Sequence, residues 1–209
     1  MSDVAKTVAK MLLEIQAIKL NVSNPFTWAS GWKSPIYCDN RMSLSYPKVR
    51  TYIKEQLAVN IAKTFPEVAA IAGVATAGIP QGALVAEALN LPFLYVRSKP
   101  KGHGMENLIE GKITAGQKVV LIEDLISTGG SSLSAAEALR AADFKVLGMA
   151  AIFTYGFSIA EEKFKEFGVH LITLCSYSEL IDEALKLKYI SSDQVAHLQK
   201  WRENPAAWS

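Results

Sequence analysis

Short apolar runs alternate with helical patterns through the middle of this chain. Continuous apolar stretches predict strands over residues 68–75, 93–97, 118–124, 145–153 and 170–175. The intervening patterns predict helices over 80–89, 132–142 and 158–167. Buried strands separated by helices of about ten residues form right-handed βαβ units. The pattern therefore predicts an α/β fold with a parallel sheet flanked by helices.

The two ends of the chain follow different patterns. Charged residues from Asp3 to Glu14 recur at helical intervals and predict an amphipathic helix over 3–20. The segment NPFTWASGWKSPIYCDNR, residues 24–41, is interrupted by glycine and proline, and a helix is expected after Pro47 to about residue 65. Two further helices are predicted near 178–187 and 191–203.

Composition narrows the class of protein. Half of the 209 residues are apolar, and a net charge of +2 gives no strong field for nucleic acid or an anionic membrane. No apolar run has the length of a membrane span, and the N-terminus does not have the pattern of a signal peptide. Cys38 and Cys175 are far apart without metal-ligand spacing, which fits a reducing compartment. We expect a cytoplasmic protein that binds neither nucleic acid nor membrane.

The segment KVVLIEDLISTGGSS, residues 118–132, contains the strongest chemical pattern. An apolar strand is expected to end in Glu123 and Asp124, and a loop of glycines and hydroxyl residues leads into a helix. Glycines allow close approach to a phosphate, hydroxyls donate to its oxygens, and a helix N-terminus favours an anion. The two acids can hold ribose hydroxyls or, through water, Mg²⁺. This pattern favours a site for a phosphorylated sugar over an ordinary β–α turn, which is the alternative.

Neither common nucleotide-binding loop is present, because the chain has no G-x-x-x-x-G-K-[ST] and no G-x-G-x-x-G after a strand. Three loops are expected at the carboxyl ends of strands, after Ala75, Arg97 and Asp124, where open α/β sheets bind ligands. The loop over 98–114 is long, which is typical of a functional or mobile segment. Its cationic residues suit a polyanion, although a solvated charged loop is the alternative.

The segment VVLIEDLISTGGSS closely resembles the phosphoribosyl pyrophosphate (PRPP) signature of type I phosphoribosyltransferases. RSKPKGHG, GVATAGIPQGALVA and FTWASGWKSPIYCDNR resemble the mobile loop, pyrophosphate loop and hood of the orotate phosphoribosyltransferase family. The resemblance covers about residues 20–180. It implies the type I phosphoribosyltransferase fold with a small N-terminal hood, in a single domain over 1–209. Within that domain we expect an N-terminal helix and hood to about 45, an α/β core to about 180, and C-terminal helices from about 181.

The resemblance also assigns residues to roles. Those implied to bind PRPP are Arg97, Lys101, His103, Glu123, Asp124, Leu125, Ile126, Ser127, Thr128, Gly129, Gly130 and Ser131. Those implied to line the pyrophosphate are Ala75, Thr76, Ala77 and Gly78. Ser127 and Tyr37 are implied to bind orotate, and Lys101, His103 and Asp124 to act in catalysis. The implied cofactor is Mg²⁺, bound through PRPP and water rather than directly by the protein.

The reaction implied is transfer of ribose 5-phosphate from PRPP to orotate, giving orotidine 5′-monophosphate and pyrophosphate in pyrimidine synthesis. The resemblance further implies a homodimer in which each mobile loop reaches the neighbouring active site. A general base is left unassigned. Three positions depart from the family, because Ala29, Ala77 and Ser98 stand where a basic residue is common. Transfer to another base, PRPP sensing by a regulator, and an inactive interaction protein are the alternatives.

The aromatic residues allow two interpretations. Phe26, Trp28, Trp32 and Tyr37 lie in the glycine-rich segment, where they could stack on a planar base or pack in the core or a dimer contact. Trp201 and Trp208, near the C-terminus, are expected to pack in the core or at an interface.

Overall fold

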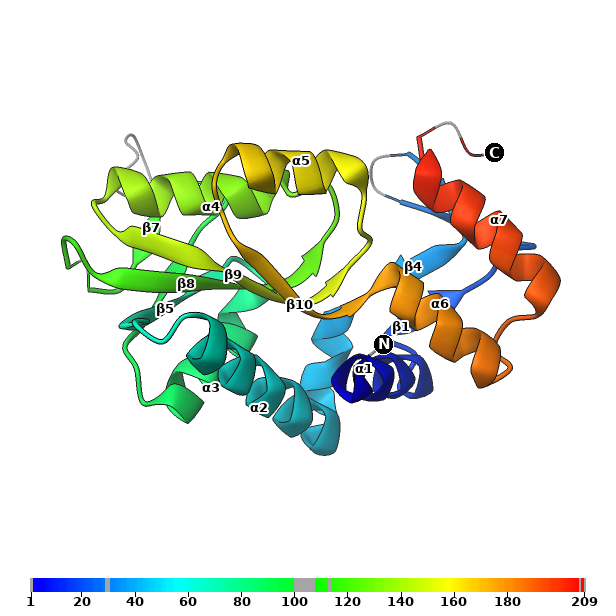
Figure 1. Ribbon diagram of the computed structural model, residues 1–209, viewed down its shortest axis with the longest axis horizontal. Helices are drawn as coiled ribbons and strands as arrows, with labels where there is room; N and C mark the ends of the chain where they lie inside the picture. Colours follow the sequence, from blue (N-terminus) through cyan, green and yellow to red (C-terminus); the bar gives the residue numbers. More distant parts are fainter. Residues whose placement is uncertain (1, 29–30, 100–107, 113, 207, 209) are drawn as a thin grey trace.

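The computed structural model describes residues 2–28, 31–99, 108–112, 114–206 and 208 (Figure 1). Its main sheet has six strands in the order β10-β9-β8-β5-β6-β7, and all neighbouring pairs are parallel except β6 with β7. The strands are β5 (Ala70–Val74), β6 (Phe93–Val96), β7 (Ile109–Glu110), β8 (Lys118–Ile126), β9 (Lys145–Thr154) and β10 (Leu171–Ser176). The predicted parallel sheet is confirmed. The antiparallel edge strand β7 was not predicted, because two residues are too few to show a strand pattern in the sequence.

Helices cover both faces of this sheet (Figure 1). On one face lie α2 (Pro47–Thr64) and α3 (Gly78–Leu89), and on the other lie α4 (Gly130–Ala141) and α5 (Ser158–Glu166). Successive side chains of a strand point to opposite faces. Ile71 and Ile122 therefore pack with the first pair of helices, and Ala72 and Leu121 with the second.

The two ends of the chain meet beside the sheet (Figure 1). Their elements are α1 (Asp3–Glu14), β1 (Ile18–Leu20), β2 (Phe26–Thr27), β3 (Lys33–Ser34), β4 (Ile36–Cys38), the 3₁₀ helix η1 (Asn40–Ser45), α6 (Tyr177–Lys186) and α7 (Ser192–Glu203). The predicted helix over 3–20 is wrong beyond Glu14. Gln16 has a φ of 57°, which ends the helix, and Ile18–Leu20 pairs with β4.

The order of the strands places an opening between β5 and β8. The chain passes from β5 to β6 on one side, then places β8, β9 and β10 on the other side of β5. Pairing of β8 with β5 ends at Ile122, whereas pairing with β9 continues to Ile126. The strand therefore runs past Asp124, where the sequence predicted its end. Ligands of open α/β sheets bind at such a switch of direction.

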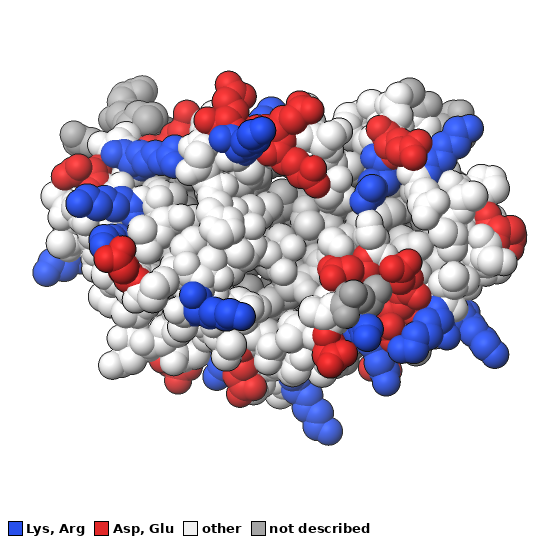
Figure 2. Space-filling model, viewed as in Figure 1, with Lys and Arg blue, Asp and Glu red and all other residues white. Residues whose placement is uncertain are grey.

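Charged side chains of both signs lie next to one another around the rim of the face shown in Figure 2. No large patch of one sign covers this face, which agrees with the small net charge of +2. Among the helices described here, none is both long enough and apolar enough to cross a membrane.

Candidate active site

The loop between β8 and α4 has the features of an anion site. Gly129, with a φ of 78°, precedes the helix, and the first turn contains Gly130, Ser131 and Ser132 and no acidic residue. Within the described chain, no side chain forms a capping hydrogen bond at this N-terminus. The N–H groups of the first turn have no partner within the helix and carry its positive partial charge. The loop can therefore bind a phosphate.

A second loop, Ala75–Ala77, lies across the opening and leads into α3. The Ala75–Thr76 peptide bond is cis, and the Ala75 amide donates to the Val96 carbonyl at 2.8 Å. Gly78 lies directly against β8: a Cβ atom built there would contact the Ile122 carbonyl and lie 3.4 Å from Glu123 Oε2. The absence of a side chain at Gly78 thus allows the loop to approach the acid pair.

The two acids point to opposite faces of β8. Glu123 lies on the α4 side, where the Ser132 hydroxyl donates to Oε1 at 3.3 Å and the Asp124 amide donates to Oε2 at 3.2 Å. Burial, and then the charge of Asp124, raise the pKa of Glu123 to about 8. Burial also raises the pKa of Asp124 to about 6, against the opposing effect of Arg41. At neutral pH Glu123 is therefore protonated and Asp124 ionised.

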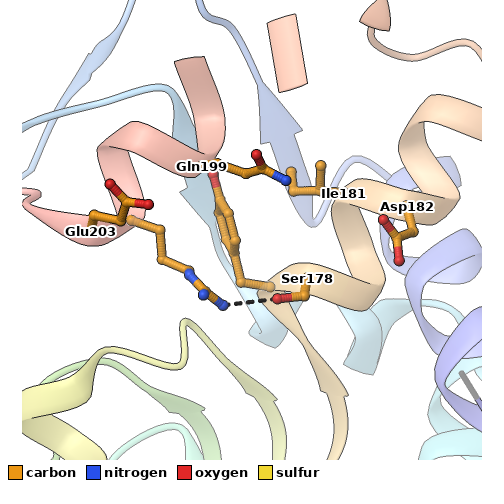
Figure 3. A pocket seen from close by; sticks show the side chains of 7 residues that line it. Ser178, Ile181, Asp182, Gln199 and Glu203 are labelled. Atoms are coloured by element: carbon orange, nitrogen blue, oxygen red, sulfur yellow. Dashed lines mark hydrogen bonds between the residues drawn. The ribbon is translucent and has the colours of Figure 1, made fainter. Parts of the chain in front are cut away.

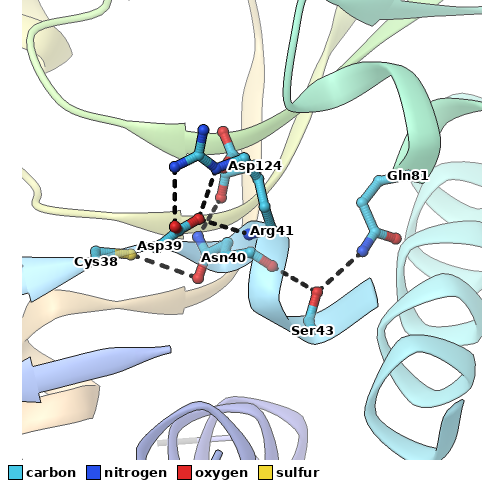
Figure 4. A network of polar contacts seen from close by, with 7 residues as sticks. All are labelled: Cys38, Asp39, Asn40, Arg41, Ser43, Gln81 and Asp124. Atoms are coloured by element: carbon cyan, nitrogen blue, oxygen red, sulfur yellow. Dashed lines mark hydrogen bonds and ion pairs between the residues drawn. The ribbon is translucent and has the colours of Figure 1, made fainter. Parts of the chain in front are cut away.

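A hydrogen-bonded chain holds the backbone at Asp124 (Figure 4). The Asn40 amide donates to the Asp124 carbonyl at 2.7 Å, on the part of β8 that extends beyond its pairing with β5. The Ser43 hydroxyl donates to the Asn40 carbonyl at 2.6 Å, and Gln81 Nε2 of α3 donates to Ser43 at 3.2 Å. The chain therefore connects the helix after the Ala75–Ala77 loop with the acid-bearing strand.

Arg41 brings positive charge to the same region. Its Nε and Nη2 donate to the two Asp39 oxygens at 2.6 and 2.8 Å (Figure 4). This pairing lowers the pKa of Asp39, and the Arg41 charge also acts on Asp124. Arg41 thus favours the ionised form of Asp124.

An aromatic cavity of about 280 Å³ opens beside the loop between β8 and α4. Its lining residues are Thr27, Trp28, Tyr37, Cys38, Leu125, Ser127 and Tyr155. Trp28 and Tyr155 form one wall, with ring centroids 5.1 Å apart. The two residues predicted to bind orotate, Tyr37 and Ser127, are thus brought to the same cavity.

A smaller cavity of about 150 Å³ lies next to the first turn of α4, where Ser131 lines it. Its lining includes Ala75, Arg97, Ser98 and Ser131, so the three loops predicted at strand ends do converge. Arg97 Nη1 donates to Glu110 Oε1 of β7 at 3.2 Å, which holds the guanidinium at the edge of this cavity. Ser98, one of the departures from the family, lines the same cavity without adding charge.

Some predicted residues lie outside the described part of the chain, namely Lys101, His103 and the family departure Ala29. Conversely, the structure adds Asn40 and Tyr155, which were not among the predicted site residues. Asn40 lies in the last residues of the hood motif FTWASGWKSPIYCDNR, and this position is the signal that could have suggested it. Tyr155 directly follows β9. Because open α/β sheets bind ligands at the carboxyl ends of their strands, this position could have suggested a role for it.

Comparisons with known proteins agree with this geometry. The model of the phosphoribosyl transferase domain matches residues 49–184. An orotate phosphoribosyltransferase of Phocaeicola vulgatus is 59% identical over 208 residues, covering 100% of this chain and 98% of that protein. One of Listeria innocua is 55% identical, covering 99% of each chain. A crystal structure of orotate phosphoribosyltransferase from Aeropyrum pernix superposes with a TM-score of 0.77 at 28% identity, covering 88% of this chain and 99% of that one.

The fold and the site together define a phosphoribosyltransferase of type I, as the sequence predicted. Within that class, the chain belongs to the orotate phosphoribosyltransferase family.

The hydrogen bond from Asn40 to the Asp124 carbonyl should make a measurable contribution to the free energy of unfolding. Asn40 is 1% exposed, so Asn40→Ala leaves the Asp124 carbonyl without this donor. We expect the free energy of unfolding to fall by about 1–3 kcal/mol, the cost of an unsatisfied buried polar group. Urea denaturation measures it, with exposed Asn24→Ala as the control. Equal stabilities of the two variants would contradict the role given to Asn40.

The raised pKa of Glu123 predicts a pH-dependent stability. Between its ordinary value of 4.5 and about 8, the unfolded chain has lost this proton while the folded protein retains it. The free energy of unfolding therefore decreases as pH rises through this window. Glu123→Gln cannot titrate, so from pH 5 to 8 it should gain on the order of 2–4 kcal/mol relative to the parent protein. Denaturation at several pH values tests this, and a constant difference would refute the assignment.

Proposed function

We propose that this protein transfers the 5-phosphoribosyl group of PRPP to orotate, forming orotidine 5′-monophosphate and pyrophosphate. The observation that carries the proposal is the position of Ser127. This residue begins the loop that can bind phosphate and also lines the aromatic cavity. A sugar phosphate in the loop and a planar base in the cavity would meet there, as transfer between them requires.

The phosphate groups of PRPP have separate binding regions in this proposal. The loop from Ser127 to Ser131 and the N-terminus of α4 bind the 5′-phosphate through hydroxyl and amide donors. The pyrophosphate lies against the backbone of Ala75–Gly78, with Arg97 at the edge of the adjoining cavity. The resemblance adds Lys101 and His103 to this group. Donors and cations there would stabilise negative charge that develops on the leaving oxygen.

The acid pair would act on the ribose in two different protonation states. Protonated Glu123 can donate a hydrogen bond, whereas ionised Asp124 can accept one. As N1 of orotate attacks C1′ and pyrophosphate departs, positive charge develops on the ribose ring. The carboxylate of Asp124 would favour this charge electrostatically.

The base would lie in the aromatic cavity. Trp28 and Tyr155 offer apolar ring surfaces to a planar ligand, and the Ser127 hydroxyl offers a hydrogen bond. Tyr37 is 41% exposed, and its ring lies 5.7 Å from that of Phe26. In this proposal Tyr37 would cover a bound base from the solvent side.

We further infer that the enzyme uses Mg²⁺, forms a homodimer and works in the cytoplasm, as the resemblance implies. Among the described residues, no group of three or more acids, histidines and cysteines could hold a metal. Asp124 nevertheless offers one ionised oxygen of the kind that Mg²⁺ prefers. When bound to PRPP and water, Mg²⁺ would neutralise charge on the leaving pyrophosphate.

The reaction can be tested by the loss of orotate absorbance when the purified protein is mixed with PRPP and Mg²⁺. We expect turnover with orotate and at least a hundredfold lower kcat/KM with adenine or hypoxanthine, because hydrogen-bonding sites reject mismatched ligands strongly. A preference for a purine would refute the proposed base, and binding of PRPP without transfer to any base would favour a sensor.

Replacement of Lys101 tests whether this residue stabilises the leaving pyrophosphate. Lys101→Ala should lower kcat by about 10²- to 10³-fold, the usual loss when one transition-state donor is removed. Lys112→Ala is the matched control, because this exposed lysine lies near the far end of the same 98–114 segment and should keep kcat within about twofold. Near-normal turnover of Lys101→Ala would remove this residue from the mechanism.

A further inference from the structure

The C-terminal helix α7 lies outside the matched domain but packs behind the wall of the aromatic cavity. The domain model ends at residue 184, whereas α7 spans Ser192–Glu203. Trp201 of this helix is 0% exposed. Its ring lies 5.6 Å from that of Trp28 and 5.7 Å from that of Tyr155, measured between centroids. Both neighbours line the cavity, so Trp201 forms a second layer behind its wall.

Two hydrogen bonds hold α7 on α6. The Tyr177 hydroxyl donates to the Leu198 carbonyl at 3.0 Å, and Arg202 Nη1 donates to the Ser178 hydroxyl at 2.8 Å. Figure 3 shows the outer side of this contact, with Ser178 on α6 facing the helix that carries Gln199 and Glu203. Since α6 directly follows β10, these bonds connect α7 to the sheet.

A further bond joins α7 to the hairpin of the hood. Trp201 Nε1 donates to the carbonyl of Lys33 at 3.2 Å, across 168 positions of the sequence. Lys33 lies in β3 and pairs with Thr27 of β2, directly before Trp28. The Trp28 indole in turn donates to the Ile36 carbonyl at 3.1 Å. Trp201 therefore holds both the backbone that carries Trp28 and the ring itself.

We propose that Trp201 is a positioning residue for the base: its N–H and its ring hold the hood hairpin so that Trp28 and Tyr155 form the wall of the aromatic cavity. This inference rests on the proposed function in placing the base in that cavity. Packing alone would require a large apolar side chain at this position. The bond to Lys33 requires the indole N–H, because phenylalanine and leucine have no donor there.

Trp201→Phe separates the two contributions, since it keeps an aromatic ring and removes the donor. We expect KM for orotate to rise about fivefold, the size of effect that one hydrogen bond has. KM for PRPP should stay within about twofold, because the hydrogen bond that is removed ends at Lys33 in the hood hairpin and not in the loop from Ser127 to Ser131. Steady-state kinetics with each substrate varied in turn measures both, at a temperature below the unfolding transition of every variant.

Tyr177→Phe is the matched control. It also removes one donor to a backbone carbonyl in the same aromatic cluster, but this bond stays between α6 and α7. Its KM for orotate should be unchanged. An equal rise in both variants would show general loosening of the cluster and would overturn the specific role of Trp201, as would an unchanged KM in Trp201→Phe.

Hydrogen exchange of the hood peptide, residues 24–36, gives a readout that does not depend on activity. Exchange should become faster in Trp201→Phe and remain unchanged in Tyr177→Phe. If the parent protein fails to use orotate, the proposed function fails, while this measurement still decides whether Trp201 holds the hairpin. Unchanged exchange in Trp201→Phe would overturn the inference.

Discussion

The site depends on the point where β5 and β8 separate. Their pairing ends at Ile122, while β8 continues beside β9 for four more residues. The strand segment that carries the two acids is thus paired on one side and open on the other. Loops from both sides of the switch enter this opening, which explains why residues distant in sequence surround it. If β5 paired further along β8, the Ala75–Ala77 loop would be moved away from the acids.

At the open edge of β8, the N-terminal segment donates a hydrogen bond to the backbone of the strand. A backbone carbonyl without a strand partner requires another donor when it is buried. Asn40 supplies that donor to Asp124, and Ser43 and Gln81 hold Asn40 in turn. The same 3₁₀ helix contains Arg41, whose charge favours ionised Asp124. One short element therefore holds the backbone at this acid and opposes the rise in its pKa that burial causes, while burial on the opposite face favours protonated Glu123.

Much of the fold could be predicted from local pattern. The strands β5, β6, β8, β9 and β10 and the helices between them appear within a few residues of their predicted ranges, because buried strands and amphipathic helices have different periods. The pattern failed at residues 15–20, where the helical period continues but pairing with β4 forms a strand. The pattern also predicted that the loops after Ala75, Arg97 and Asp124 converge, because parallel strands end at the same edge of a sheet. It could not give the Asn40–Asp124 or Trp201–Lys33 bonds, which join residues 84 and 168 positions apart. No local property of asparagine or tryptophan identifies such partners.

The two halves of the site come from different parts of the chain. The loops proposed to bind phosphate and ribose, around Ala75, Arg97 and Ser127, all lie within the domain matched over 49–184. The aromatic cavity combines that domain with the hood, and the hood is held by Trp201 beyond the domain. A domain shared by enzymes of different base specificity can keep its sugar-phosphate loops unchanged if the base is bound by flanking segments. In this chain those segments contact each other directly through the Trp201–Lys33 bond and the Trp28–Trp201 ring contact. A substitution in the hood hairpin or in α7 should therefore affect recognition of the base more strongly than recognition of the sugar phosphate.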